Sequence, residues 1–200
     1  MNFKHVLALS PHTDDVEHAC GGTIARLIDD GSHVTCIAFW GTPLLRQECG
    51  RALTILGVRD YKVLDFERRR YPEQRQEILQ FLYDYDCEND VDLVLTPTTY
   101  DLHQDHQTIT NEVRRAFKNS TILGYVFPKN TLESRVNCFI ALEEKHLKKK
   151  IDSVLQYKSQ IEKRPFWFNE NYIRSLATTW GGHIMVKYAE AFETIKIVWK

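Results

Sequence analysis

Apolar runs alternate with amphipathic segments through the first two thirds of the chain. The short apolar runs predict strands at 5–10, 33–40, 61–66, 91–97 and 122–127. Apolar residues at helical spacing predict helices at 17–31, 46–58, 72–86 and 106–120. Strands that alternate with helices of this length indicate right-handed βαβ crossovers. We therefore expect an α/β fold, a Rossmann-like three-layer α/β/α sandwich with a mostly parallel sheet.

The last third of the chain is less regular. It predicts a strand at 136–143, a helix with a basic face at 143–160, an aromatic-rich loop and helix at 161–180, and a terminal strand at 192–199. The sequence shows no linker, repeat or low-complexity tract. We therefore expect residues 1–200 to form a single domain.

Composition narrows the class of partner. The chain has 200 residues, 26 Lys and Arg, and 27 Asp and Glu, for a net charge of −1. This balance argues against a nucleic-acid partner, because phosphate binding requires a basic surface. No run reaches the roughly 18 apolar residues that a membrane span needs. A small-molecule partner fits best, and self-association into a homo-oligomer is compatible with the sequence.

The N-terminal segment and the cysteines indicate the cellular compartment of the protein. The N-terminal apolar stretch is too short for a signal peptide, and Pro11 follows it at once. The five cysteines are odd in number and contain no CxxC pair. A chain of this size with a sizeable core does not need a disulfide framework. We expect reduced thiols in a cytoplasmic protein.

Two dense His/Asp clusters follow predicted strands. The segment "SPHTDDVEHACGG" (10–22) comes directly after the first strand, and "TPTTYDLHQDHQ" (96–107) comes after the fourth. Ligands of open α/β sheets bind outside the carboxyl ends of the strands. If the first and fourth strands are neighbours, the two clusters face each other across one crevice.

The residue types in these clusters suit a metal. Two histidines and one aspartate form a catalytic zinc set when water takes the fourth position, and ferrous iron shares this pattern. A second carboxylate nearby can take a proton from the bound water. Each cluster alone fits a simpler interpretation, a loop histidine or aspartates that cap a helix. Two matching clusters at two strand ends favour the metal site.

The same segments carry a family resemblance. "PHTDDVEHACGGTIARL" resembles the "PHPDDE…GGT" motif, and "HQDH" the "HxDH" motif, of the PIG-L/LmbE-like zinc deacetylases. These enzymes remove acetyl groups from N-acetylglucosamine conjugates and related amino sugars by hydrolysing a linear amide C–N bond. "RQECGRALTILGV" (46–58) looks like the second helix of this family, and "YAEAF" (188–192) like its terminal signature.

The resemblance implies a role for each matching residue. The zinc ligands would be His12, Asp15 and His106. Asp14 would act as general base on the metal-bound water. His103, oriented by Asp105, would steady the tetrahedral intermediate or protonate the leaving amine. Two positions depart from the family pattern, with Thr13 in place of proline and Val16 in place of glutamate. The loss of that glutamate bears on tuning of the site more than on metal binding. The glycines Gly21 and Gly22 are expected to let the chain approach the site closely.

Candidate substrate contacts are less specific. Arg68, Arg69 and Arg70 follow the third strand at the ligand-binding edge, where a guanidinium can grip a phosphate or carboxylate. A solvated charged loop is the equally plain interpretation. Arg46 is a weaker candidate of the same kind, and Trp40, at the end of the second strand, is a candidate for stacking on a sugar face.

We therefore expect a zinc-dependent hydrolase that deacetylates an N-acetyl amino sugar or its conjugate, in cell-surface polysaccharide or nucleotide-sugar metabolism. The alternative is a non-catalytic or differently specific metal- or sugar-binding member of the same fold, which Thr13 and Val16 alone favour. A nucleotide-binding dehydrogenase is disfavoured, because carboxylates stand where a GxGxxG loop would present bare amides to a pyrophosphate.

Overall fold

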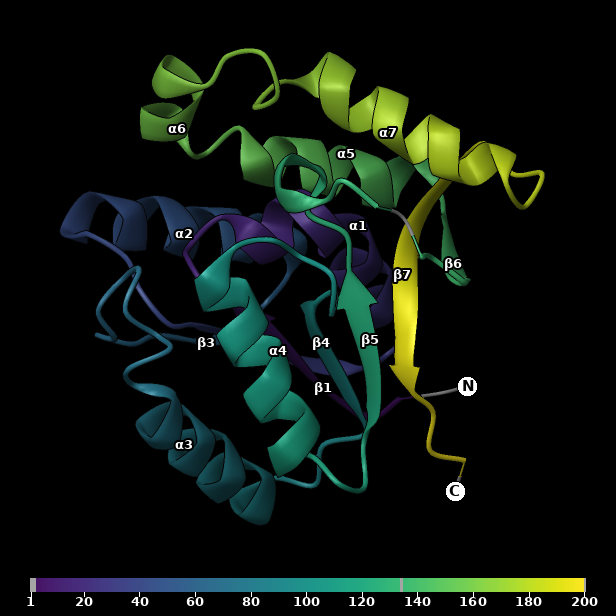
Figure 1. Ribbon diagram of the computed structural model, residues 1–200. Coiled ribbons are helices and arrows are strands. Elements are labelled where there is room, and N and C mark those ends of the chain that lie inside the picture. The colour runs from purple at the N-terminus through teal and green to yellow at the C-terminus, as the bar shows by residue number, and fades with distance from the viewer. Residues whose placement is uncertain (1–2, 134, 200) are drawn as a thin grey trace.

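The computed structural model describes residues 3–133 and 135–199, and it contains a seven-stranded sheet of order β3-β2-β1-β4-β5-β7-β6 (Figure 1). The strands are β1 (His5–Ser10), β2 (His33–Ala38), β3 (Asp60–Val63), β4 (Leu93–Pro97), β5 (Thr121–Tyr125), β6 (Cys138–Leu142) and β7 (Tyr188–Lys196). The helices are α1 (Asp15–Asp29), α2 (Pro43–Leu56), α3 (Arg75–Glu88), α4 (Gln104–Ala116), α5 (Glu144–Val154), α6 (Lys158–Lys163), α7 (Glu170–Gly182) and the short 3-10 helix η1 (Pro128–Asn130).

Strands β1 to β5 are parallel, and β6 and β7 form an antiparallel extension beside β5. Helices α3 and α4 cover one face of the sheet, whereas α1, α2 and α5 cover the other, with α7 stacked outside α5 (Figure 1). Each face has its own buried apolar cluster. The predicted three-layer α/β/α sandwich with a mostly parallel sheet is confirmed.

The order of the strands places the two polar clusters together. Strand β1 pairs in parallel with β2 on one side and with β4 on the other. The chain winds outward from β1 to β3 and then crosses back to β4, so the strand order reverses between β1 and β4. The loops that follow β1 and β4 therefore leave the sheet at the same edge, where open α/β sheets bind ligands.

Several predicted boundaries differ from the observed ones. The helix predicted over 143–160 is divided into α5 and α6 by a turn at Leu155–Tyr157. The turn has a packing cause, since the buried Tyr157 hydroxyl donates a 2.7 Å hydrogen bond to Glu17 in α1. The terminal strand begins at Tyr188, four residues before the predicted start, so "YAEAF" lies within β7. No helix of the described chain is long and apolar enough to cross a membrane.

Helix α1 is kinked at Cys20, whose φ and ψ are −133° and 23°. The two members of a buried ion pair form hydrogen bonds with backbone groups on both sides of the kink. The Lys150 ammonium lies 2.5 Å from the Glu190 carboxylate and donates to the Ala19 carbonyl at 3.1 Å. Glu190 in turn accepts hydrogen bonds from the backbone N–H groups of Gly22 and Thr23. The pair therefore takes the place of the helical hydrogen bonds that the kink removes.

The two glycines of this kink serve packing rather than the site. A Cβ on Gly22 would lie 2.5 Å from Leu142 Cδ1 of β6, and one on Gly21 would lie 3.3 Å from Lys150 Cγ of α5. The expectation that Gly21 and Gly22 let the chain approach the site is wrong. They let α1 approach the antiparallel extension and helix α5 instead.

Candidate active site

The β1–α1 loop is held by hydrogen bonds to its own backbone. The Ser10 hydroxyl donates to the His12 carbonyl at 2.5 Å, and the Tyr71 hydroxyl donates to the Pro11 carbonyl at 2.6 Å. Asp14 adopts a φ of +100°, a conformation that side-chain-bearing residues avoid. It stands at the N-cap position of α1, yet its side chain makes no capping hydrogen bond. The strained loop therefore leaves the Asp14 carboxylate free to face the cleft.

His12, Asp15 and His106 converge on one point. Oδ2 of Asp15 lies 3.3 Å from Nδ1 of His12 and 3.3 Å from Nε2 of His106. One ligand atom from each residue lies within 4.8 Å of the others. Asp15 and His106 are buried, and His12 lies at the wall of the cleft. Such a set of two imidazoles and a carboxylate suits a divalent metal such as zinc.

Asp101 fixes the orientation of His106. Its Oδ2 atom lies 2.9 Å from Nδ1 of His106, and its Oδ1 atom accepts a 2.8 Å hydrogen bond from the His103 backbone. With Nδ1 occupied by this carboxylate, Nε2 of His106 points toward Asp15. Metal-bound histidines in proteins commonly have a carboxylate partner of this kind.

A second group, His12, His103 and Asp105, also meets the distance requirement for a metal. It is the weaker candidate, because Nδ1 of His103 already accepts a 3.1 Å hydrogen bond from the Asp105 backbone N–H. The Asp105 carboxylate lies 3.0 Å from Nε2 of His12 and also accepts a 2.7 Å hydrogen bond from the Arg69 backbone N–H. The hydrogen bond from Asp105 to the His103 ring thus comes from the Asp105 backbone N–H.

The charges of the centre are mutually dependent. Burial alone would lower the pKa of His106, but Asp15 and Asp101 outweigh it and raise that pKa to about 10. Burial likewise opposes ionisation of Asp15, yet His106 and His12 hold its pKa well below the usual range. Burial, followed by repulsion from Asp15, raises the pKa of Asp14. Burial and the neighbouring His106 and His12 lower the pKa of His103 to about 4.

These residues form the floor of a cleft of about 390 Å³. Its walls come from five parts of the chain, which are the loop after β1, the loop after β2, the Arg68 loop, η1 and the end of α6. Apolar surface is supplied by Trp40, Leu44, Leu45 and Phe127, and the cationic side chains that line it are Arg68, Lys129, Lys163 and Arg164. The cleft is thus carboxylate-rich at its buried floor and cationic at its partly exposed mouth.

Of the five predicted substrate contacts, only Trp40 and Arg68 line the cleft. The Arg68 guanidinium lies 5.1 Å from the Trp40 ring centre. The Arg46 side chain instead donates to the carbonyls of Gly41, Val63 and Leu64 and pairs with Asp65. Arg69 contributes its backbone, which hydrogen-bonds Asp105 and the Gln104 side chain. The exposed Arg70 pairs with Glu67 and Glu73.

Among the charged residues that line the cleft or contact its histidines, Asp101, Lys129, Lys163 and Arg164 had no assigned role in the sequence interpretation. Asp101 belongs to the second cluster, and its place five residues before His106 was the available signal. Lys129, Lys163 and Arg164 come from η1 and the end of α6, outside both clusters, and no local pattern marks them.

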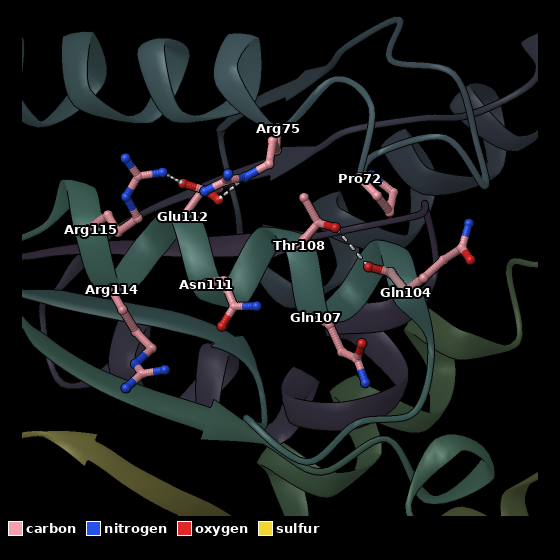
Figure 2. Close-up of a pocket in the computed structure, with 9 residues that line it drawn as sticks. All are labelled: Pro72, Arg75, Gln104, Gln107, Thr108, Asn111, Glu112, Arg114 and Arg115. Atoms are coloured by element: carbon pink, nitrogen blue, oxygen red, sulfur yellow. Dashed lines mark hydrogen bonds and ion pairs between the residues drawn. The ribbon is translucent and has the colours of Figure 1, made fainter.

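A larger groove of about 680 Å³ lies elsewhere, along the outer side of α4 (Figure 2). Figure 2 shows that two of its arginines, Arg75 and Arg115, both reach the buried carboxylate of Glu112. The groove contains none of the residues of the metal centre. Its size therefore does not make it the site of the chemistry, because its main charges already satisfy each other.

Comparison with known proteins agrees with this geometry. The family described as PIG-L, GlcNAc-PI de-N-acetylase, matches residues 7–117. The chain is 28% identical over 169 residues to the uncharacterized deacetylase YaiS of Escherichia coli K12, covering 78% of this chain and 91% of that protein.

Solved structures share the fold across different chemistries. The N,N′-diacetylchitobiose deacetylase of Pyrococcus horikoshii has a TM-score of 0.68 at 22% identity, covering 96% of this chain and 84% of that one. The 4-carboxy-2-hydroxymuconate hydratase GalB of Pseudomonas putida KT2440 has a TM-score of 0.80 at 17% identity, covering 98% of both chains. At these identities the likeness establishes the fold alone. The family match spans both His/Asp clusters and more than half of the chain, and on that ground this chain belongs to the PIG-L family.

Proposed function

We propose that this protein is a zinc-dependent hydrolase that removes the acetyl group from an N-acetyl amino sugar or its conjugate. The observation that carries the proposal is the convergence of His12, Asp15 and His106 beside the free carboxylate of Asp14. Membership of the PIG-L family supports it, as do the names of YaiS and of the diacetylchitobiose deacetylase.

The residues fit a divalent metal. Two nitrogen ligands and one carboxylate leave a coordination position for water or substrate, and Asp101 supports His106 from behind. Zinc held by His12, Asp15 and His106 would supply Lewis acidity to the amide carbonyl and acidify a water molecule. Ferrous iron suits the same donor set.

Asp14 is the proposed general base. It adjoins Asp15 in the chain, lines the cleft, and forms no side-chain hydrogen bond within the described residues. Its carboxylate therefore has both oxygens available to take the proton from the attacking water. The φ of +100° aims the side chain into the cleft instead of toward the helix N-terminus.

His103 is the proposed donor to the reacting amide. Because its Nδ1 accepts from the Asp105 backbone N–H, the neutral ring carries its proton on Nε2. Nε2–H of the neutral ring is then available to stabilise negative charge on the carbonyl oxygen, whereas delivery of a proton to the leaving amine would require the ring to be protonated first. Asp105 sets this tautomer through its backbone, while its carboxylate restrains His12.

The substrate contacts follow from the cleft walls. Trp40, stacked with Arg68, offers a face on which a sugar ring packs. Arg68 is the one arginine of the 68–70 run that lines the cleft. A reducing, cytoplasmic location agrees with five cysteines that are all free thiols.

The test is acetate release from a panel of N-acetyl amino sugars by the zinc-loaded protein. We expect turnover by the wild type and loss of turnover in Asp14→Asn, with metal content unchanged. A wild type no faster than Asp14→Asn on every substrate would favour the alternative, a metal- or sugar-binding protein without catalysis. Metal analysis of His12→Ala and His106→Ala tests the ligand assignment separately, with loss of the ion as the expected result.

A further inference from the structure

The mouth of the cleft carries an excess of positive charge. Arg68, Lys129, Lys163 and Arg164 line it, against the two lining carboxylates Asp14 and Asp15. A divalent ion on the His/Asp floor would add two further positive charges. Cations reach the cleft from three separate elements, the loop after β3, the helix η1 and the end of α6.

These cations lack carboxylate partners. None of the four forms an ion pair among the described residues, whereas Arg75 and Arg115 in the groove of Figure 2 share Glu112. The Nε atom of Arg68 is buried and has no hydrogen-bond partner in the described chain. A buried guanidinium N–H without a partner is costly, so it indicates a group that the bound ligand supplies.

Three of the four cations lie over aromatic rings rather than beside acids. Arg68 lies 5.1 Å from the ring centre of Trp40, and Lys129 and Arg164 each lie 5.8 Å from that of Trp167. Burial, and then repulsion from Arg164, lowers the pKa of Lys129. Like charges that crowd one space without acids paired to them form an anion-binding arrangement.

We propose that the substrate carries an anionic oxygen group, a phosphate or a carboxylate, attached to the amino sugar, and that Arg68 and Arg164 bind this group. This inference rests on the proposed function. The acetamide lies over the buried floor at Asp14 and His103, and the anionic group lies at the mouth. The two arginines determine specificity, since a guanidinium presents paired donors to phosphate or carboxylate oxygens. Lys129 and Lys163 add attraction at the exposed rim.

The test measures how the zinc-loaded protein deacetylates three derivatives of N-acetylglucosamine. These are the neutral methyl glycoside, the carboxymethyl glycoside and the 1-phosphate. We expect kcat/KM to be at least about 10-fold higher on one anionic substrate than on the neutral one, with the better arm identifying carboxylate or phosphate. Arg68→Gln and Arg164→Gln should each lower kcat/KM on that substrate by about 10-fold and reduce the ratio of its kcat/KM to that of the methyl glycoside. Arg114→Gln, an exposed arginine outside the cleft, is the matched control and should change neither value.

Equal kcat/KM on the three substrates, unchanged in the two variants, would overturn the proposal and leave the deacetylase function intact. Direct binding separates the two claims. Calorimetric titration of the zinc-loaded protein with glucose 1-phosphate and with the carboxymethyl glucoside should show binding of at least one that glucose itself lacks and that Arg68→Gln and Arg164→Gln weaken. If neither anionic sugar binds, the arginine site is contradicted. It is also contradicted if binding persists in both variants because the metal holds the anion. Both outcomes can be read even if no N-acetyl substrate is deacetylated.

Discussion

The carboxylate of Asp101 lies 2.9 Å from Nδ1 of His106, and both side chains are almost wholly buried. An aspartate in this position fixes the ring and increases the basicity of the opposite nitrogen. We expect Asp101→Asn to weaken zinc affinity by about 10- to 100-fold, while His106→Ala abolishes stoichiometric binding. Competition against a fluorescent zinc chelator measures both. Unchanged affinity in Asp101→Asn would show that His106 does not depend on this partner.

The free carboxylate of Asp14 gives a second prediction. Asp14→Asn should lower kcat by about 10²- to 10⁴-fold, because the amide cannot take the proton of the attacking water. Asparagine tolerates positive φ, so the loop geometry at +100° is retained. Steady-state kinetics together with metal analysis of the same preparation check the result. Loss of the metal along with the activity would assign Asp14 to the ligand set instead.

The buried ion pair at the α1 kink gives a third. Lys150→Met leaves the Glu190 carboxylate buried without its counter-ion and should reduce the free energy of unfolding by about 3–5 kcal/mol. Lys149→Met is the control, because Lys149 pairs with Asp29 at the surface and should cost at most about 1 kcal/mol. Equilibrium unfolding in urea measures both. Similar small losses in the two variants would mean that the kink does not depend on the pair.

Packing at Gly22 gives a fourth prediction. Gly22→Ala places a Cβ 2.5 Å from Leu142 Cδ1 and should destabilise the protein by about 1–3 kcal/mol. Gly182→Ala, at the end of α7, meets nothing within 4 Å and should be neutral or stabilising by up to about 1 kcal/mol. Thermal denaturation of the two variants side by side is the measurement. A tolerated Gly22→Ala would show that β6 can move away from α1.

The acid sensitivity of the fold gives a fifth. His18 is buried among aromatic rings, and burial lowers its pKa to about 4 from the ordinary 6.5. Between these two values the unfolded chain binds a proton that the folded chain does not, so stability falls as pH falls from 6.5 to 4. The loss attributable to His18 should reach about 3 kcal/mol.

Replacing His18 by phenylalanine should remove this part of the pH dependence. Urea unfolding of wild type and His18→Phe from pH 7 to pH 4 is the measurement. Parallel pH profiles for wild type and His18→Phe would contradict the buried, neutral state of this ring.

Much of the fold could be predicted because its signals are local. The strand at His5–Ser10 matches its prediction, since a run of apolar side chains predicts a strand buried on both faces. The boundaries that moved have tertiary causes. Tyr157 breaks the predicted 143–160 helix by turning inward to Glu17, a contact across 140 positions that no window of sequence reveals.

The sequence by itself determined the fold class and the two His/Asp clusters. Both are local features, because hydrophobic periodicity and the polar residues that follow a strand can be recognised from neighbouring residues. Only the tertiary structure decided which charged residues face the cleft. It turned Arg46 toward backbone carbonyls and left Arg68 at the mouth of the cleft. It also brought Lys129 of η1 and Arg164 of the irregular last third to the same cleft. The physical reason is that the residue type tells only whether a side chain is charged. The group that pairs with this charge depends on packing between segments that are distant in the chain.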